Sequence, residues 1–177
     1  MERTITIFGS AKPKPGDAQY EFAYQLGAKL AEEGFNICTG GYAGIMEAAS
    51  KGAYDKGGLV YAVTVDNWNS VPNPYITIEV RGKTLFERIE KLIEMGDAYV
   101  VLQGGTGTFL ELAAIWEYAN KKLQPPKPIV CHSYMWKTIV EVLDKQMQFE
   151  GRETGIVKPC ESVEEIVSYL KNKLIKF

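Results

Sequence analysis

One stretch decides the fold of this chain: Ala98-Tyr99-Val100-Val101-Leu102-Gln103-Gly104-Gly105-Thr106-Gly107-Thr108-Phe109-Leu110-Glu111. An apolar run typical of a buried strand comes first, then a glycine turn, then a helical pattern, so the stretch predicts a βα unit. Glycines let the backbone approach a ligand closely, and the first N–H groups of a helix, together with the helix dipole, favour an anion. We therefore expect a phosphate to bind at Gly104, Gly105, Thr106, Gly107 and Thr108.

Glu111 lies about one turn inside the same helix, and its role has two interpretations. Its carboxylate can reach a group attached to the phosphate, where an acid, a base or a hydroxyl-binding group is needed. Alternatively, Thr108 and Glu111 have the spacing of a capping box, in which the hydroxyl and the carboxylate satisfy the helix end without any ligand. The residues alone leave both interpretations open.

The composition predicts one soluble globular domain over residues 1–177. A chain of 177 residues that is 46% hydrophobic can fill one core and is short for two. The formal charge of −2 is spread without a basic block, which argues against binding of nucleic acid. Three widely spaced cysteines favour a reducing compartment over a disulfide framework. Because no signal-peptide pattern and no membrane-length apolar run is present, we expect a cytoplasmic protein without membrane contact.

Short apolar runs rich in β-branched residues alternate with amphipathic segments along the chain, and this alternation predicts βαβ units. Strands are expected at Thr4–Phe8, Asn36–Cys38, Val60–Val65, Ile76–Val80, Ala98–Leu102 and Pro128–Cys131. Helices are expected between Asp17 and Gly34, over Ala43–Asp55, Thr84–Met95, Phe109–Lys121 and Tyr134–Gln148, and after a capping box that starts at Ser162. The pattern predicts a single three-layer, Rossmann-like α/β domain whose parallel sheet is flanked by helices on both faces.

Three glycine turns follow predicted strands. Phe8-Gly9-Ser10 leaves the first strand, the segment Thr39–Glu47 leaves the second, and the stretch quoted above contains the third. Ligands of such folds bind beyond the carboxyl ends of the strands, so we expect the three turns at one edge of the sheet. Ser10, which either donates to the phosphate or caps its turn, and Gly41 would complete the phosphate site. Neither longer turn matches the usual dinucleotide or triphosphate motifs.

These residues resemble the lonely-guy family of nucleotide phosphoribohydrolases, long described as possible lysine decarboxylases. The family motif P-G-G-x-G-T-x-x-E is matched over Gly104–Glu111, with Gln103 where proline is usual. A second family element, M-x-x-R-K, falls on Leu85–Ile89, with Arg88 in place and Ile89 where lysine is usual. The likeness covers most of the chain.

The resemblance implies hydrolysis of the N-glycosidic bond of a nucleoside 5′-monophosphate, of the purine or cytokinin riboside type, to a free base and ribose 5-phosphate. It places the phosphate on residues 105–108 and makes Arg88 and Glu111 the catalytic pair. A carboxylate near the ribose can stabilise an oxocarbenium-like sugar or help to activate water. The planar arginine can neutralise the phosphate or keep the glutamate ionised.

Neither a cofactor nor a metal ion is expected. No lysine is placed by a recognisable motif for pyridoxal phosphate, which a decarboxylase would need, and the single histidine, His132, has no ligand cluster around it. A homodimer is expected, because the resemblance implies one and because the helix Phe109–Lys121 is apolar almost all round and must be covered. A second copy, with Leu85, Phe86 and Ile93 joining the surface, or the C-terminal helix would cover it.

Some residues support less specific interpretations. Arg88 lies in a segment of mixed charge, where a solvated arginine pairing with neighbouring glutamates is the ordinary case. Trp68, in the long polar loop after the third strand, either covers a base by stacking or packs the loop down. The second functional hypothesis is a non-catalytic protein that binds a nucleotide or another phosphate ligand as a sensor or regulator, and Ile89 and Gln103 favour it.

Overall fold

A computed structural model describes residues 2–66 and 68–175. Its strands are β1 (Arg3–Phe8), β2 (Phe35–Thr39), β3 (Val60–Val65), β4 (Ile78–Gly82), β5 (Ala98–Val101), β6 (Ile129–Cys131) and β7 (Val157–Pro159). Its helices are α1 (Ala18–Glu32), α2 (Ile45–Asp55), α3 (Leu85–Met95), α4 (Thr106–Asn120), α5 (Tyr134–Phe149) and α6 (Val163–Leu174). All strand pairs are parallel and form one sheet in the order β4-β3-β2-β1-β5-β6-β7. The predicted three-layer α/β fold is confirmed.

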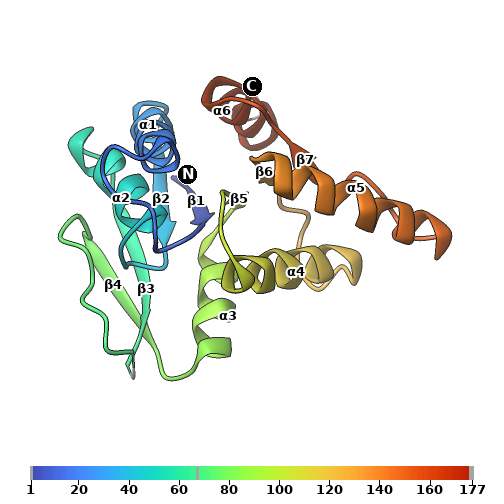
Figure 1. Cartoon of the computed structure of the whole chain (residues 1–177), viewed down its shortest axis with the longest axis horizontal. Coiled ribbons are helices and arrows are strands. Elements are labelled where there is room, and N and C mark those ends of the chain that lie inside the picture. Colours follow the sequence, from blue (N-terminus) through green and yellow to red (C-terminus); the bar gives the residue numbers. More distant parts are fainter. Residues whose placement is uncertain (1, 67, 176–177) are drawn as a thin grey trace.

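Helices cover both faces of the sheet. In Figure 1, α1 and α6 lie above the labels of β1, β2 and β5, and α3 and α4 lie below them. Ile5, Ile7 and Ile37 pack with α1, α2 and α6 in one core layer. Phe8 and Tyr99 pack with α3, α4 and α5 in the other. The central strands β2 and β5 are buried along their whole length, as expected of a parallel sheet that is covered on both faces.

The strand order reverses between β1 and β5, and the glycine turns meet at this switch point. The chain runs outward from β1 through β4 and then returns to the other side of β1. Leu102 N donates to Phe8 O at 2.9 Å, and Ser10 N donates to Gln103 O at 3.0 Å. Ile45 N donates to Ser10 O at 2.8 Å. These bonds hold all three turns at the carboxyl ends of the strands, where ligands of such sheets bind.

β4, β7 and α2 differ from the prediction. β4 covers Ile78–Gly82, two residues later than the expected Ile76–Val80. β7 was not expected, because Val157-Lys158-Pro159 is too short and too polar to show a strand pattern. Its proline is tolerated because β7 is an edge strand. α2 begins at Ile45 and not at Ala43, since Gly44 has φ +71° and lies outside the helix. No helix in the described part of the chain is long and apolar enough to cross a membrane.

The surroundings of α4 correct the expectation that α6 covers it. α6 packs against α1 on the opposite face of the sheet, so that alternative is wrong. α5 covers part of α4, and Phe109 stacks on Trp136 with ring centroids 6.3 Å apart. Ile93, assigned above to a dimer surface, is buried in the core, whereas Leu85 and Phe86 are exposed.

Candidate functional site

Helix α4 begins at Thr106, three residues earlier than predicted. Gly105 is the N-cap residue, and no side chain caps the helix. Thr108 therefore lies inside the helix with a buried side chain, and the capping box of Thr108 and Glu111 is wrong. The first N–H groups of a helix have no carbonyl partner within it, so this uncapped end can donate to an anion at the carboxyl end of β5.

At two positions of this helix end, the fold itself does not require glycine. Of the 17 glycines, all but Gly105 and Gly107 either have a positive φ or leave too little room for a Cβ. A Cβ on Gly104, for example, would overlap Thr108 Oγ1. A Cβ on Gly105 or Gly107 would meet nothing within 4 Å, and neither residue has a positive φ. The space beside the helix end is therefore open to a ligand.

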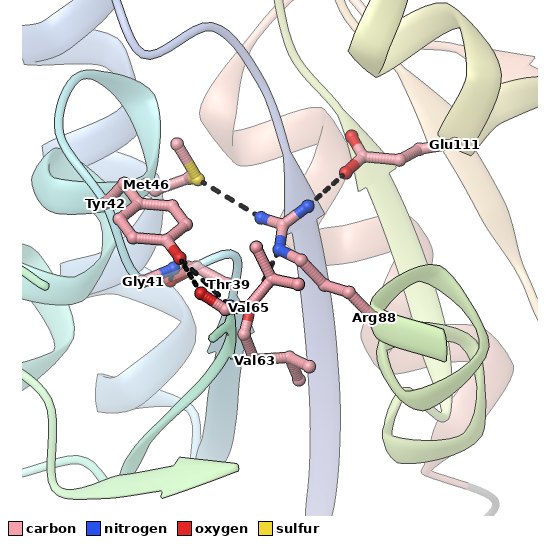
Figure 2. A network of polar contacts seen from close by, with 8 residues as sticks. All are labelled: Thr39, Gly41, Tyr42, Met46, Val63, Val65, Arg88 and Glu111. Atoms are coloured by element: carbon pink, nitrogen blue, oxygen red, sulfur yellow. Dashed lines mark hydrogen bonds and ion pairs between the residues drawn. The ribbon is translucent and has the colours of Figure 1, made fainter. Parts of the chain in front are cut away.

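Arg88 of α3 is buried, with 4% of its surface exposed. Its Nε donates to Val63 O of β3 at 2.8 Å, and its Nη2 faces Met46 Sδ at 3.9 Å (Figure 2). A Cβ at position 40 would overlap Nη2, so the close approach of the guanidinium requires Gly40. The interpretation of Arg88 as a solvated residue that pairs with neighbouring glutamates is thus wrong.

Glu111 reaches Arg88 from the second turn of α4. Arg88 Nη1 and Glu111 Oε1 are 3.3 Å apart in a buried ion pair (Figure 2). Burial raises the pKa of the Glu111 carboxyl to about 7, although the charge of Arg88 acts in the opposite direction. A carboxyl with this pKa can take up and release a proton at neutral pH. The structure therefore brings together the two residues predicted as a catalytic pair, although they lie 23 positions apart in the chain.

Two aromatic side chains lie against the guanidinium of Arg88. Tyr42 was not predicted as a site residue, and Trp68 was expected either to stack on a base or to pack the loop. The guanidinium carbon lies 5.8 Å from the ring centroid of Tyr42 and 5.1 Å from that of Trp68. The two rings are 5.6 Å apart. Tyr42 is buried, whereas Trp68 is 43% exposed. The sequence features that could have indicated these two contacts are the glycine turn around Tyr42 and the position of Trp68 in a polar loop.

A polar pocket of about 310 Å³ lies beside the N-terminus of α4. Its lining includes Ser10, Lys12, Gln19, Gln103 and Gly104. Ser10 Oγ accepts from Lys12 N at 3.1 Å, and Gln19 Nε2 donates to Gln103 Oε1 at 3.1 Å. A slightly larger pocket, about 350 Å³, lies between α1 and α6 and contains none of the predicted site residues. Over the described ranges, no three His, Cys, Asp or Glu side chains are grouped so as to hold a metal ion.

Gly41 differs from the other predicted phosphate ligands. It is buried, its N–H donates to Thr39 Oγ1 at 3.1 Å, and its carbonyl accepts from Asn73 N at 2.8 Å. A phosphate could receive the Gly41 N–H only if the bond to Thr39 were broken, and the contact stays a prediction. The adjacent Gly40 was missed as a site residue, although the glycine pair itself was a signal of close backbone approach.

Comparison with known proteins gives both unassigned and named relatives. An uncharacterized protein of Archaeoglobus fulgidus is 33% identical over 109 residues, which are 60% of this chain and 72% of that protein. Cytokinin riboside 5′-monophosphate phosphoribohydrolase LOG of Oryza sativa is 30% identical over 129 residues, or 67% of this chain and 50% of the rice protein. The cytokinin riboside 5′-monophosphate phosphoribohydrolase of Rhodococcoides fascians is 26% identical over 132 residues, which are 72% of this chain and 66% of that protein. This chain thus spans half to two thirds of these phosphoribohydrolases.

Solved structures with the same fold extend over the whole chain. The molybdenum cofactor binding protein from Rippkaea orientalis has a TM-score of 0.79 at 23% identity, covering 98% of both chains. The molybdenum cofactor carrier protein of Chlamydomonas reinhardtii has a TM-score of 0.76 at 22% identity, covering 99% of this chain and 100% of that one. A protein-family comparison matches residues 2–167 to the SLOG cluster4 family. Together with the two motifs and the fold, this match shows that the chain belongs to the SLOG cluster4 family and is a lonely-guy-like protein.

Proposed function

We propose that the protein is a phosphoribohydrolase that cleaves the N-glycosidic bond of a nucleoside 5′-monophosphate of the purine or cytokinin riboside type. One observation carries this proposal: the buried Arg88–Glu111 pair lies next to an uncapped helix end whose glycines the fold does not require. The names of the relatives from rice and Rhodococcoides fascians support the same reaction.

The helix geometry supports a ligand that joins these two features. The uncapped N–H groups at Thr106 and Gly107 would bind the 5′-phosphate, and Thr108 would contribute its backbone N–H. Glu111 lies five positions beyond Thr106, or about 7.5 Å along the helix axis at 1.5 Å per residue. That length is comparable with a ribose 5-phosphate, so a phosphate at the helix end would bring the sugar to the carboxylate.

The proposed reaction balances with water alone. Water adds a hydroxyl to C1′, the C1′–N bond breaks with its electron pair on the base, and the proton from water ends on the base nitrogen. As positive charge develops on the sugar, an ionised Glu111 would stabilise it, and a Glu111 with a pKa near 7 can also carry the proton from water. Arg88 would keep the carboxylate ionised and orient it through the 3.3 Å contact.

A non-catalytic binding role is the second candidate function. The structural neighbours that match nearly the whole chain are described as a binding protein and a carrier protein for the molybdenum cofactor. In addition, Ile89 and Gln103 replace the lysine and proline that are usual in the phosphoribohydrolase motifs. In this role the open helix end would hold the phosphate group of a ligand that is not cleaved.

A panel of ligands distinguishes the two functions. The purified protein is incubated with AMP, GMP, CMP, UMP and N6-isopentenyl-AMP, and free base and ribose 5-phosphate are quantified by chromatography. The matched nucleosides without phosphate serve as controls, because the helix end has nothing to bind in them. Release of base from at least one monophosphate, and from none of the nucleosides, is the expected result. Tight binding of a monophosphate without release of base would support the binding role.

A further inference from the structure

The segment from Val65, the last residue of β3, to Asn73 is held at its two ends. At its start, Tyr42 Oη accepts from Val65 N at 3.0 Å. At its far end, the buried Asn73 donates from its backbone N–H to Gly41 O at 2.8 Å and from Nδ2 to Tyr42 O at 3.1 Å. Both ends are therefore tied to the glycine turn that leads into α2, and Trp68 lies between them.

Trp68 has a much larger exposed fraction than the other two tryptophans. It is 43% exposed, compared with 4% for Trp116 and 1% for Trp136. Its ring lies over the guanidinium of Arg88, 5.1 Å from the guanidinium carbon to the ring centroid. Arg88 is already positioned by Val63 O and Glu111, so it does not depend on Trp68 for its place. A large aromatic ring that is partly open beside a buried charged pair is suited to ligand contact.

We propose that Trp68 determines specificity by stacking on the planar aromatic base of the bound nucleotide. This inference rests on the proposed function. With the phosphate at the N-terminus of α4 and the sugar at Glu111, the base attached to C1′ extends toward Arg88, whose guanidinium lies against Trp68. Stacking tolerates any aromatic base, so Trp68 would favour nucleotides over phosphates without a ring and would not select one base.

Binding measurements with two probes test the inference. AMP carries both phosphate and base, and ribose 5-phosphate carries the phosphate alone. Both are titrated calorimetrically against Trp68→Ala, Trp68→Phe and Val71→Ala in a Glu111→Gln background, in which the proposed function predicts cleavage of AMP about a hundredfold slower than in the parent protein. Val71 is the matched control, because it is an exposed apolar residue of the same loop. A second readout is the quenching of tryptophan emission by AMP, which should come from the exposed Trp68.

We expect Trp68→Ala to weaken AMP binding about tenfold or more, as is typical for loss of one stacking side chain. Ribose 5-phosphate should bind unchanged, Trp68→Phe should retain most of the AMP affinity, and Val71→Ala should behave like the parent protein. Equal losses of affinity for both probes would show that Trp68 acts by positioning the site, and unchanged AMP affinity would show that Trp68 does not contact the base. Either result overturns this inference and leaves the proposed function standing. If the parent protein binds neither probe, the proposed function fails and the inference fails with it.

Discussion

At the scale of single residues, Glu111 should make the stability of the protein depend on pH. Its pKa is about 7 in the folded chain, above the ordinary 4.5 of an unfolded glutamate. Between these values the folded state holds a proton that the unfolded state has lost, so the free energy of unfolding falls as pH rises from 4.5 through 7. Glu111→Gln cannot ionise, and its stability should fall less over this interval.

Urea denaturation at several pH values between about 5 and 8 measures this effect. Glu117→Gln is the matched control, because Glu117 lies on the same helix and is exposed. The difference between Glu111→Gln and the parent protein should grow with pH, whereas Glu117→Gln should follow the parent. Parallel pH profiles for the parent and Glu111→Gln would contradict a raised Glu111 pKa.

The roles of single residues were predictable only in part. Arg88 and Glu111 were assigned together because each matched a family motif, not because the residues themselves indicated a contact. Arg88 lies among charged neighbours and looks like a surface residue. Its burial depends on Val63 O and on the space left by Gly40, and both belong to other elements of the fold. Such contacts between distant segments cannot be derived from spacing along one helix.

At the scale of elements, the glycine that leaves room for phosphate at the N-terminus of α4 should also make this helix less stable. Gly107 lies in the first turn, where alanine is a better helix former by up to about 1 kcal/mol. Because a Cβ there meets no protein atom, Gly107→Ala should raise the melting temperature. The same methyl group would occupy the ligand space, so the affinity for ribose 5-phosphate should fall.

Differential scanning calorimetry and titration with ribose 5-phosphate test both parts of this expectation. Gly104→Ala is the contrasting variant, since its Cβ would overlap Thr108 Oγ1, and it should lower the melting temperature. If Gly107→Ala binds ribose 5-phosphate as well as the parent protein does, the phosphate does not lie at this helix end.

The elements that were predicted correctly are those with long, regular patterns. β1 and α3 were placed to within one residue, because β1 is a run of β-branched and apolar residues and the Thr84 side chain caps the start of α3. The start of α4 was missed because glycine is a poor helix former, and Gly107 suggested a longer turn. β7 was missed because three residues of mixed polarity contain no periodicity, and only pairing with β6 makes them a strand.

At the scale of the whole molecule, we propose a homodimer through the apolar residues left exposed on α3 and α4. Phe86 is 71% exposed, Phe109 43% and Leu85 38%, and both helices pack in the same core layer. Burial of these side chains would favour association. Sedimentation equilibrium at micromolar concentration should give twice the 19.7 kDa of one chain.

The variant Phe86→Glu should sediment as a single chain. Phe149→Glu, which changes an 85% exposed residue at the far end of α5, is the control and should remain dimeric. A parent protein with the mass of one chain, or a dimer that Phe86→Glu leaves intact, would contradict this interface.

Release of base by Glu111→Gln tests the central claim most directly. The variant keeps the size and polarity of the side chain but lacks the negative charge that would stabilise the sugar cation. With the monophosphate that the parent protein cleaves fastest, turnover should fall by about a hundredfold or more, as for loss of one catalytic electrostatic group. Affinity for ribose 5-phosphate should stay the same, because the helix end is unchanged. Unchanged turnover in Glu111→Gln would contradict the catalytic role of the Arg88–Glu111 pair.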